Sequence, residues 1–255
     1  MKCENGVYFP SVLTNLSKIK KEHFLNNRST PTCAILFVKE PRPDQVKTRL
    51  HGCCSPQQAA ALYRAFILDS ATILAASAAT LKVVAYAPVT AAAAMRRLLS
   101  PEKFEFIPQP EMDLGGRMDR LLHWSMARGA RRTVIIGSDS PSLPPAYIDQ
   151  ALDLLKEHKV VLGPSTDGGY YLVGQSSANG TIFVDIDWST GRVLEQTLEK
   201  VGTQSLGLLP PWYDVDTPPE AGFLKVHLEA LQRTGNPQGR HSLPLLRKLD
   251  LPPPS

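Results

Sequence analysis

Carboxylates at two places in the sequence could hold a divalent cation. A short apolar run ends at Ser138 and Asp139, and a later extended segment carries Asp214 and Asp216. Carboxylate oxygens suit Mg²⁺ or Mn²⁺, and residues i and i+2 of an extended segment point to the same side. Carboxylates from two such segments could together bind a metal ion that also binds phosphate groups. The alternatives are that Asp139 caps the next helix and that Asp216 supports a cap at Thr217.

Cations gather in the loop that follows the apolar run 33–38, namely Lys39, Arg42, Lys47 and Arg49. A loop directly beyond a buried strand faces the ligand crevice of an α/β sheet, and Lys or Arg there can neutralise a diphosphate. The loop lacks the GxxxxGK[ST] pattern of a Walker loop. We predict that Lys39, Lys47 and Arg49 contact phosphate, with a solvated charged loop as the alternative.

Three further residues are candidates for ligand contact. Asp167 precedes a glycine pair, so it could contact a sugar hydroxyl or a metal, or it could form a tight turn. Arg117 stands at the start of an expected helix, where backbone amides favour an anion. Arg192 is either a ligand contact or a plain helix-surface residue. We assign Asp139 and Asp167 as catalytic candidates and group Arg117 and Ser138 with the nucleotide-binding residues.

Strands and helices alternate around these residues. We expect strands over 33–38, 81–87, 104–107, 133–138, 160–162 and 170–173, and helices opening at Pro56 and covering 90–99, 114–128, 144–158, 190–201 and 218–231. Alternation of this kind predicts βαβ units in an α/β fold, with a mostly parallel sheet flanked by helices on both faces. We expect one domain over 32–234, an N-terminal extension over 1–31, and a loosely held Pro-rich basic tail over 235–255.

Composition narrows the class of protein. The 255 residues are 43% hydrophobic and 20% charged, with a net charge of +4, which fits an acidic small ligand and is too weak to indicate nucleic acid. No apolar run approaches the length of a membrane span, and the polar N-terminus lacks a signal-peptide core. The four cysteines form no CxxC pair, so we expect reduced thiols in the cytoplasm. The oligomeric state is open, with a homo-oligomer among the expectations.

Several motifs occur in an order that resembles a known family: VKTRL, DLGGRM, IIGSDSPSLP, GPSTDGGYYLVG, WST-x-RVL and PPWYDVDTP. The chain resembles bacterial proteins of the GT-A nucleotide-diphospho-sugar transferase superfamily, catalogued as a domain of unknown function. Some of these proteins are labelled arsenosugar-biosynthesis glycosyltransferases. More distantly, the chain is similar to molybdenum-cofactor nucleotidyltransferases and phospholactate guanylyltransferase. The resemblance spans residues 32–231.

The resemblance implies a GT-A-like single domain and roles for particular residues. By position, Lys39, Lys47 and Arg49 match the phosphate-contacting loop, whereas Asp139 and Asp216 match metal ligands, with Asp214 as a further candidate. The chain departs from the nucleotidyltransferase pattern at two places. Prolines 41 and 43 replace a glycine-rich loop, and glycine stands at 191 where relatives carry serine.

Three functions compete at this stage. The first is a metal-dependent glycosyltransferase that uses a nucleotide-diphospho-sugar and an unknown small-molecule acceptor. The second is a nucleotidyltransferase that uses a nucleoside triphosphate and releases pyrophosphate. The third is a non-catalytic nucleotide-binding module, because a fold does not by itself fix a function. Hydrolase and dehydrogenase functions are disfavoured, since neither GxSxG nor GxGxxG is present.

Overall fold

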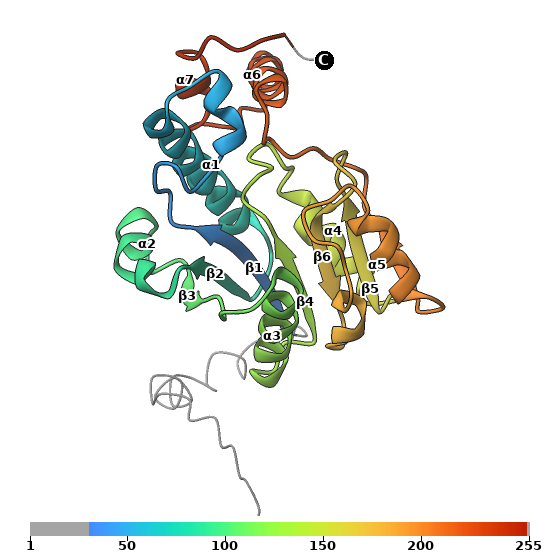
Figure 1. The fold of residues 1–255 in the computed structure, drawn as a ribbon. Helices are drawn as coiled ribbons and strands as arrows, with labels where there is room; N and C mark the ends of the chain where they lie inside the picture. Colours follow the sequence, from blue (N-terminus) through green and yellow to red (C-terminus); the bar gives the residue numbers. More distant parts are fainter. Residues whose placement is uncertain (1–30, 254–255) are drawn as a thin grey trace, which may run out of the picture. The chain divides into compact units, whose positions relative to one another are not determined.

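The computed structural model describes residues 31–253, so all of the expected N-terminal extension except Pro31 lies outside the described residues. The described residues form a sheet surrounded by helices (Figure 1). The strands are β1 Thr32–Lys39, β2 Leu81–Ala87, β3 Glu105–Pro108, β4 Arg132–Ile136, β5 Val160–Pro164, β6 Tyr170–Gln175 and β7 Leu206–Leu208. The helices are α1 Pro56–Ala76, α2 Ala92–Leu98, α3 Leu114–Ala127, α4 Ala146–Leu154, α5 Val193–Val201, α6 Pro218–Arg233 and α7 Leu243–Leu246, with short 3-10 turns η3 Thr48–Gly52, η4 Val89–Ala91 and η5 Gly180–Phe183.

The sheet is mixed but mostly parallel, as predicted. Its strand order is β3-β2-β1-β4-β6-β5-β7, and only β6 runs against its neighbours. The chain moves outward from β1 to β3 and then returns to the other side of β1 as β4. Because parallel crossovers are right-handed, this reversal places α3 on the face opposite α1 and α2. It also creates a switch point between β1 and β4, where ligands of open α/β sheets bind.

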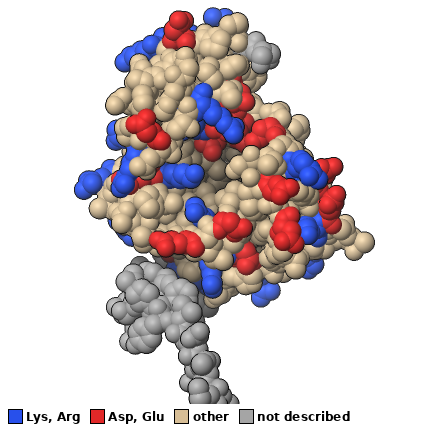
Figure 2. All heavy atoms as spheres, in the orientation of Figure 1, with Lys and Arg blue, Asp and Glu red and all other residues tan. Residues whose placement is uncertain are grey.

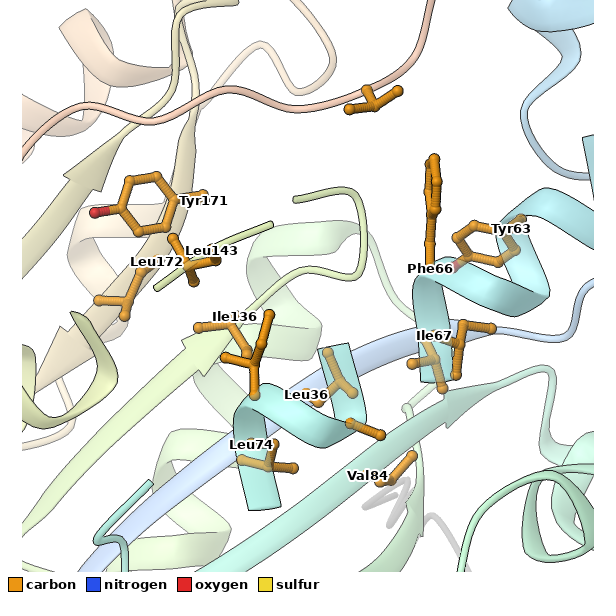
Figure 3. Close-up of a cluster of buried hydrophobic side chains, with 14 of the residues drawn as sticks. Leu36, Tyr63, Phe66, Ile67, Leu74, Val84, Ile136, Leu143, Tyr171 and Leu172 are labelled. Atoms are coloured by element: carbon orange, nitrogen blue, oxygen red, sulfur yellow. The ribbon is translucent and has the colours of Figure 1, made fainter. Parts of the chain in front are cut away.

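The sequence pattern explains why β1 is central. Its residues are buried from Thr32 to Val38, which is typical of a strand covered on both faces. Helix α1 begins at a capping box, because Ser55 accepts from the Gln58 amide while the Gln58 side chain accepts from Ser55. Figure 3 shows residues of α1 packing onto side chains of β1, β2 and β4, which anchors the carboxyl ends of these strands.

One expectation about membranes was stated too strongly. Helix α1 has 21 residues and is apolar enough, by length and composition alone, to cross a membrane. However, 67% of its most apolar window is buried inside the described domain. Its apolar residues, including Phe66, Ile67 and Leu74, belong to the hydrophobic core. The composition of α1 is therefore explained by its place in the core.

The expectation of a loosely held tail after residue 234 was wrong. Leu243 and Leu246 of α7 are buried in the main core. A Cβ added to Gly222 of α6 would lie 2.2 Å from the carbonyl oxygen of Pro252, so the last described residues pass directly over α6. Proline and basic residues suggested disorder, but a few apolar side chains suffice to fix the segment to the domain.

A buried carboxylate fastens this C-terminal segment to α1. Asp69, which is 4% exposed, accepts hydrogen bonds from the backbone amides of His241 and Ser242 at 3.0 and 2.9 Å. The Ser242 hydroxyl also donates to Asp69. Burial raises the pKa of Asp69, while these hydrogen bonds act in the opposite direction. The contact is expensive to lose because both amides would then be left without an acceptor.

Asp69→Ala is expected to lower the free energy of unfolding by about 2–4 kcal/mol, because buried amides left unpaired cost about 1–3 kcal/mol each. Asp69→Asn keeps one acceptor oxygen and is the matched control, with a smaller loss expected. Urea denaturation of the three proteins measures the difference. A loss below about 0.5 kcal/mol for Asp69→Ala would show that the tail is not held through this carboxylate.

Candidate functional site

A cleft of about 680 Å³ opens at the switch point between β1 and β4. Figure 2 shows the face of the molecule that is hollowed here, with acidic and basic side chains around the hollow. The charged side chains that line the cleft among the described residues are Lys39, Lys47, Asp113, Arg117, Asp139, Asp214 and Asp216. The fold therefore brings most of the residues singled out in the sequence to one place.

At the centre of the cleft, one lysine joins two aspartates. The ammonium Nζ of Lys47 lies 2.5 Å from Oδ1 of Asp139 and 2.7 Å from Oδ1 of Asp216. The Lys47 side chain is 3% exposed, whereas those of Asp139 and Asp216 are 43% and 41% exposed. The two aspartates predicted to share a metal therefore do converge on one point, and an ammonium group is already paired with both.

The end of β4 fixes the position of Asp139. The Ser138 hydroxyl lies 2.9 Å from the hydroxyl of Tyr63, which in turn accepts from the Lys39 amide at 3.1 Å. Burial raises the pKa of Tyr63 to about 12, so its hydroxyl keeps its proton at neutral pH. Helix α4 begins only at Ala146, which excludes the alternative that Asp139 caps it.

The start of α6 fixes the position of Asp216. The carboxylate of Glu220 accepts from the amides of Asp216 at 2.7 Å and Thr217 at 2.8 Å. Glu220 therefore satisfies the amides of the N-cap residue Thr217 and of the residue before it, as its place three residues after Thr217 predicts. The Asp216 side chain is left free of the capping role and pairs with Lys47 instead.

Asp214 also lines the cleft but does not share Lys47. Its carboxylate accepts from the hydroxyls of Ser140 and Ser165, the second at 3.0 Å, and so links the loops after β4 and β5. Burial, with the nearby charge of Asp139, raises the pKa of Asp214 to about 6. Both of its oxygens are occupied by hydroxyl donors, which separates Asp214 from the pair of more exposed aspartates.

The cations of the predicted basic loop do not all lie in the cleft. Lys39 and Lys47 line the cleft, whereas Arg49 is exposed on η3 outside it and Arg42 pairs with Glu40 at 2.6 Å. Within the loop, Lys47 adopts a left-handed conformation with φ 50°. Only two of the four cations of this loop, Lys39 and Lys47, therefore reach the cleft.

Sequence reasoning missed a buried polar residue beside Arg117. The amide nitrogen of Gln109 donates to the carbonyls of Val38 at 3.1 Å and Ala85 at 2.8 Å. Its carbonyl oxygen accepts from Arg117, whose Nε also donates to Met112. Gln109 directly follows β3, so the rule that polar residues after a strand line the cleft could have found it.

Asp113 caps α3 and changes the expected anion site there. Its carboxylate accepts from the amide of Gly116 at 2.8 Å, at the helix N-terminus where we expected an anion. Arg192 ion-pairs with Glu195 at 3.5 Å on the helix surface and does not line the cleft. The structure thus supports the surface alternative for Arg192 and leaves Arg117 as the cation of this flank.

Asp167 lies in a turn rather than in the cleft. Its carboxylate accepts from the Gly169 amide at 2.9 Å, which is the tight-turn alternative. Gly168 has φ 88°, and a Cβ there would lie 2.1 Å from the carbonyl oxygen of Gly191. The turn is thereby pressed against the loop that carries Ser189 to the cleft rim. Asp167 contributes to the site by shaping this loop pair and by its charge near Asp214.

Gly168→Ala is expected to destabilise the protein by about 2 kcal/mol or more, because a left-handed backbone and a backbone overlap both oppose the new methyl group. Gly191→Ala is the matched control, since its Cβ would lie 3.4 Å from the nearest atom, the Asp167 carbonyl oxygen. Thermal and urea unfolding compare the two variants. Equal losses would mean that the glycine contact does not hold the loops together.

The residues present fit a divalent cation shared with phosphate oxygens. Asp139 and Asp216 each use Oδ1 for Lys47, and their Oδ2 atoms have no hydrogen-bond partner among the described residues. Mg²⁺ in nucleotide enzymes is commonly bound by one or two carboxylates and completed by water and phosphate. Within residues 31–253 no group of three or more His, Cys, Asp or Glu side chains forms a metal cage. A purely protein-held metal therefore does not fit.

Comparison with known proteins adds a family to this geometry. Residues 70–190 match the family described as "Uncharacterized protein conserved in bacteria (DUF2064)". No curated protein sequence matches the chain. A crystal structure of a presumed nucleotide-diphospho-sugar transferase from Desulfovibrio desulfuricans G20 is 32% identical, with a TM-score of 0.78. The match covers 86% of this chain and 95% of that protein.

A more distant structure shows a similarity of fold alone. The 4-diphosphocytidyl-2C-methyl-D-erythritol synthase of Anaerococcus prevotii DSM 20548 is 6% identical with a TM-score of 0.50, over 78% of this chain and 99% of that one. The Rv0371c protein of Mycobacterium tuberculosis H37Rv, solved as a complex with manganese, is 15% identical with a TM-score of 0.43, over 74% and 92%. At this similarity the manganese is a property of that protein alone.

Proposed function

We propose that this chain, which belongs to the same family as the presumed nucleotide-diphospho-sugar transferase of Desulfovibrio desulfuricans, is a metal-dependent glycosyltransferase. Its donor is a nucleotide-diphospho-sugar, and its acceptor is a small molecule. The observation that carries the proposal is the pair of half-exposed carboxylates, Asp139 and Asp216, at the switch point of the sheet. The family and fold support a transferase, whereas the metal and the sugar donor are inferred from the cleft.

The charge of the cleft supports metal dependence. Its described lining residues include three cationic side chains, Lys39, Lys47 and Arg117, against four carboxylates, Asp113, Asp139, Asp214 and Asp216. A diphosphate alone would therefore enter a cleft whose formal charge is already negative. A divalent cation supplies the missing positive charge, and it would be held by Asp139 and Asp216 together with the diphosphate.

The residues of the chain then have distinct tasks in glycosyl transfer. The bond between the anomeric carbon and the diphosphate oxygen breaks while an acceptor atom bonds to that carbon and loses its proton to solvent, and negative charge grows on the departing diphosphate. A divalent cation would stabilise that charge. Lys39 and Arg117 line the cleft and have no carboxylate partner among residues 31–253, so they would contact the diphosphate. Ser138 and Tyr63 hold the β4 end in place, so that Asp139 needs little reorganisation during the reaction.

The same charge count disfavours nucleotidyl transfer as the principal reaction. A nucleoside triphosphate carries more negative charge than a nucleotide-diphospho-sugar and requires more cations around its phosphates. In the described part of the cleft, Lys47 is fully engaged by two aspartates, which leaves Lys39 and Arg117 for phosphate. The chain also lacks the glycine-rich loop of the nucleotidyltransferases that it resembles.

Incubation with a panel of nucleotide-diphospho-sugars and nucleoside triphosphates, each with Mg²⁺ or Mn²⁺, tests the reaction class. We expect slow hydrolytic release of nucleoside diphosphate from one nucleotide-sugar, and removal of the metal with EDTA should abolish it. Release of pyrophosphate from a triphosphate, with no diphosphate released from any sugar donor, would replace this proposal with nucleotidyl transfer. Binding of nucleotides without turnover in any mixture would favour the non-catalytic module.

Asp139→Asn and Asp216→Asn test the carboxylate pair. Each is expected to weaken Mn²⁺ binding at least about tenfold, because a metal loses a charged oxygen ligand. Asp113→Asn is the matched control, since asparagine also caps a helix and Asp113 lies on the other flank of the cleft. Calorimetric titration with Mn²⁺ in the presence of a nucleoside diphosphate measures the affinities. Equal losses in all three variants would contradict the assignment.

A further inference from the structure

Lys47 is buried in a way that a phosphate-contacting lysine is not. Its side chain is 3% exposed, and its Nζ lies 5.8 and 5.6 Å from the ring centroids of Tyr63 and Phe66. Two carboxylates complete the surroundings of the ammonium group. Very little of Lys47 is accessible to a ligand that enters the cleft. The resemblance to phosphate-binding loops therefore does not describe what Lys47 does in this chain.

Lys47 carries a full positive charge in this position. Its Nζ lies 2.5 and 2.7 Å from the carboxylates of Asp139 and Asp216, and two neighbouring negative charges favour the ammonium form despite its burial. The aspartates are thus paired with a cation. One positive charge shared between two negative ones leaves the pair with about one net negative charge.

The backbone holds Lys47 in place. Its φ of 50° and ψ of 38° are left-handed, a conformation that is unfavourable for a residue with a Cβ. The neighbouring Val46 and Leu50 are 6% and 0% exposed, so packing on both sides fixes the loop in this conformation. Strain of this kind persists where the surroundings over-determine it, and it is concentrated at functional sites.

We propose that Lys47 is an internal counter-ion that prevents Asp139 and Asp216 from binding a divalent cation tightly by themselves, so that cation and diphosphate bind together. This inference rests on the proposed function, because it concerns the same carboxylates. A divalent cation held by the two aspartates would be repelled by the ammonium group paired with them. A bound diphosphate adds negative charge and offsets that repulsion. Cation and diphosphate therefore strengthen one another's binding, as coupled ligands must.

The consequence is selection of the metal–diphosphate complex over either component. The metal alone binds weakly because the charge of the two aspartates is partly neutralised by Lys47. The diphosphate alone binds weakly because the cleft has a net negative charge. Lys47 is accordingly a positioning residue, which acts through the aspartates rather than on the substrate.

Lys47→Met tests the counter-ion by the sign of its effect. Removal of a unit charge about 5 Å from a divalent ion changes affinity by roughly tenfold or more, even at the dielectric constant of water. We therefore expect Lys47→Met to bind Mn²⁺ about tenfold more tightly than the wild type in the absence of any nucleotide. Calorimetry or the electron paramagnetic resonance signal of free Mn²⁺ measures this. A purely structural role for Lys47 predicts the opposite sign, because displaced aspartates bind the metal less well.

Two further variants complete the test. Lys39→Met removes a cation from the same cleft that has no carboxylate partner among the described residues, and it should change Mn²⁺ affinity less than about threefold. Lys47→Gln retains a hydrogen-bonding group without the charge and should behave as Lys47→Met does, which guards against a folding defect in either variant. Unchanged or weaker Mn²⁺ binding in the folded Lys47 variants would overturn the inference.

The proposed function can fail separately. If Asp139→Asn binds Mn²⁺ as well as the wild type does, the metal lies elsewhere and both the function and the inference fall. If Asp139→Asn loses Mn²⁺ but neither Lys47 variant gains affinity, the metal site stands and only the counter-ion is wrong.

Discussion

The ion pairing of one ammonium group with two carboxylates is the constraint on which the site depends. Lys47 comes from the loop after β1, Asp139 from the end of β4, and Asp216 from the residues before α6. Lys47 and Asp216 are 169 positions apart in the sequence. The three segments can be close only if β1 and β4 are neighbours and α6 starts above them. The ion pairs in the cleft can therefore form only when the sheet has its observed strand order.

The sequence predicted which segments lie at the cleft, but it did not predict which of their side chains are buried. The rule that residues after a buried parallel strand line the cleft correctly placed Lys39, Ser138 and Asp139. It also predicted that Lys47 and Arg49 would act alike. They differ because the chain enters a left-handed conformation at Lys47 and a 3-10 turn after it, which directs one side chain inward and leaves the other exposed. No local pattern in a charged loop announces such a change.

Elements of the fold were predictable in proportion to their length. Segments such as β1, a continuous apolar run, and α1, a helix of 21 residues, carry enough apolar residues for a pattern to be recognised. Strand β7 has three residues, and it forms because β5 offers an edge to pair with, so nothing within Leu206–Leu208 predicts it. The C-terminal segment was mistaken for the same kind of reason. Its composition is that of a disordered tail, and its order depends on partners far away in the sequence.

The anchoring of the C-terminal segment has a consequence for synthesis on the ribosome. Asp69 is buried on α1, and its amide partners follow 172 and 173 residues later. While the chain is being made, this carboxylate and the apolar surface that α7 will cover stay open to water until residue 246 has left the ribosome. The strands and helices on either side of the cleft are complete before then. Covering of α1 is therefore a late step in synthesis, and interrupted chains that end before residue 246 expose an apolar surface suited to capture by chaperones or proteases.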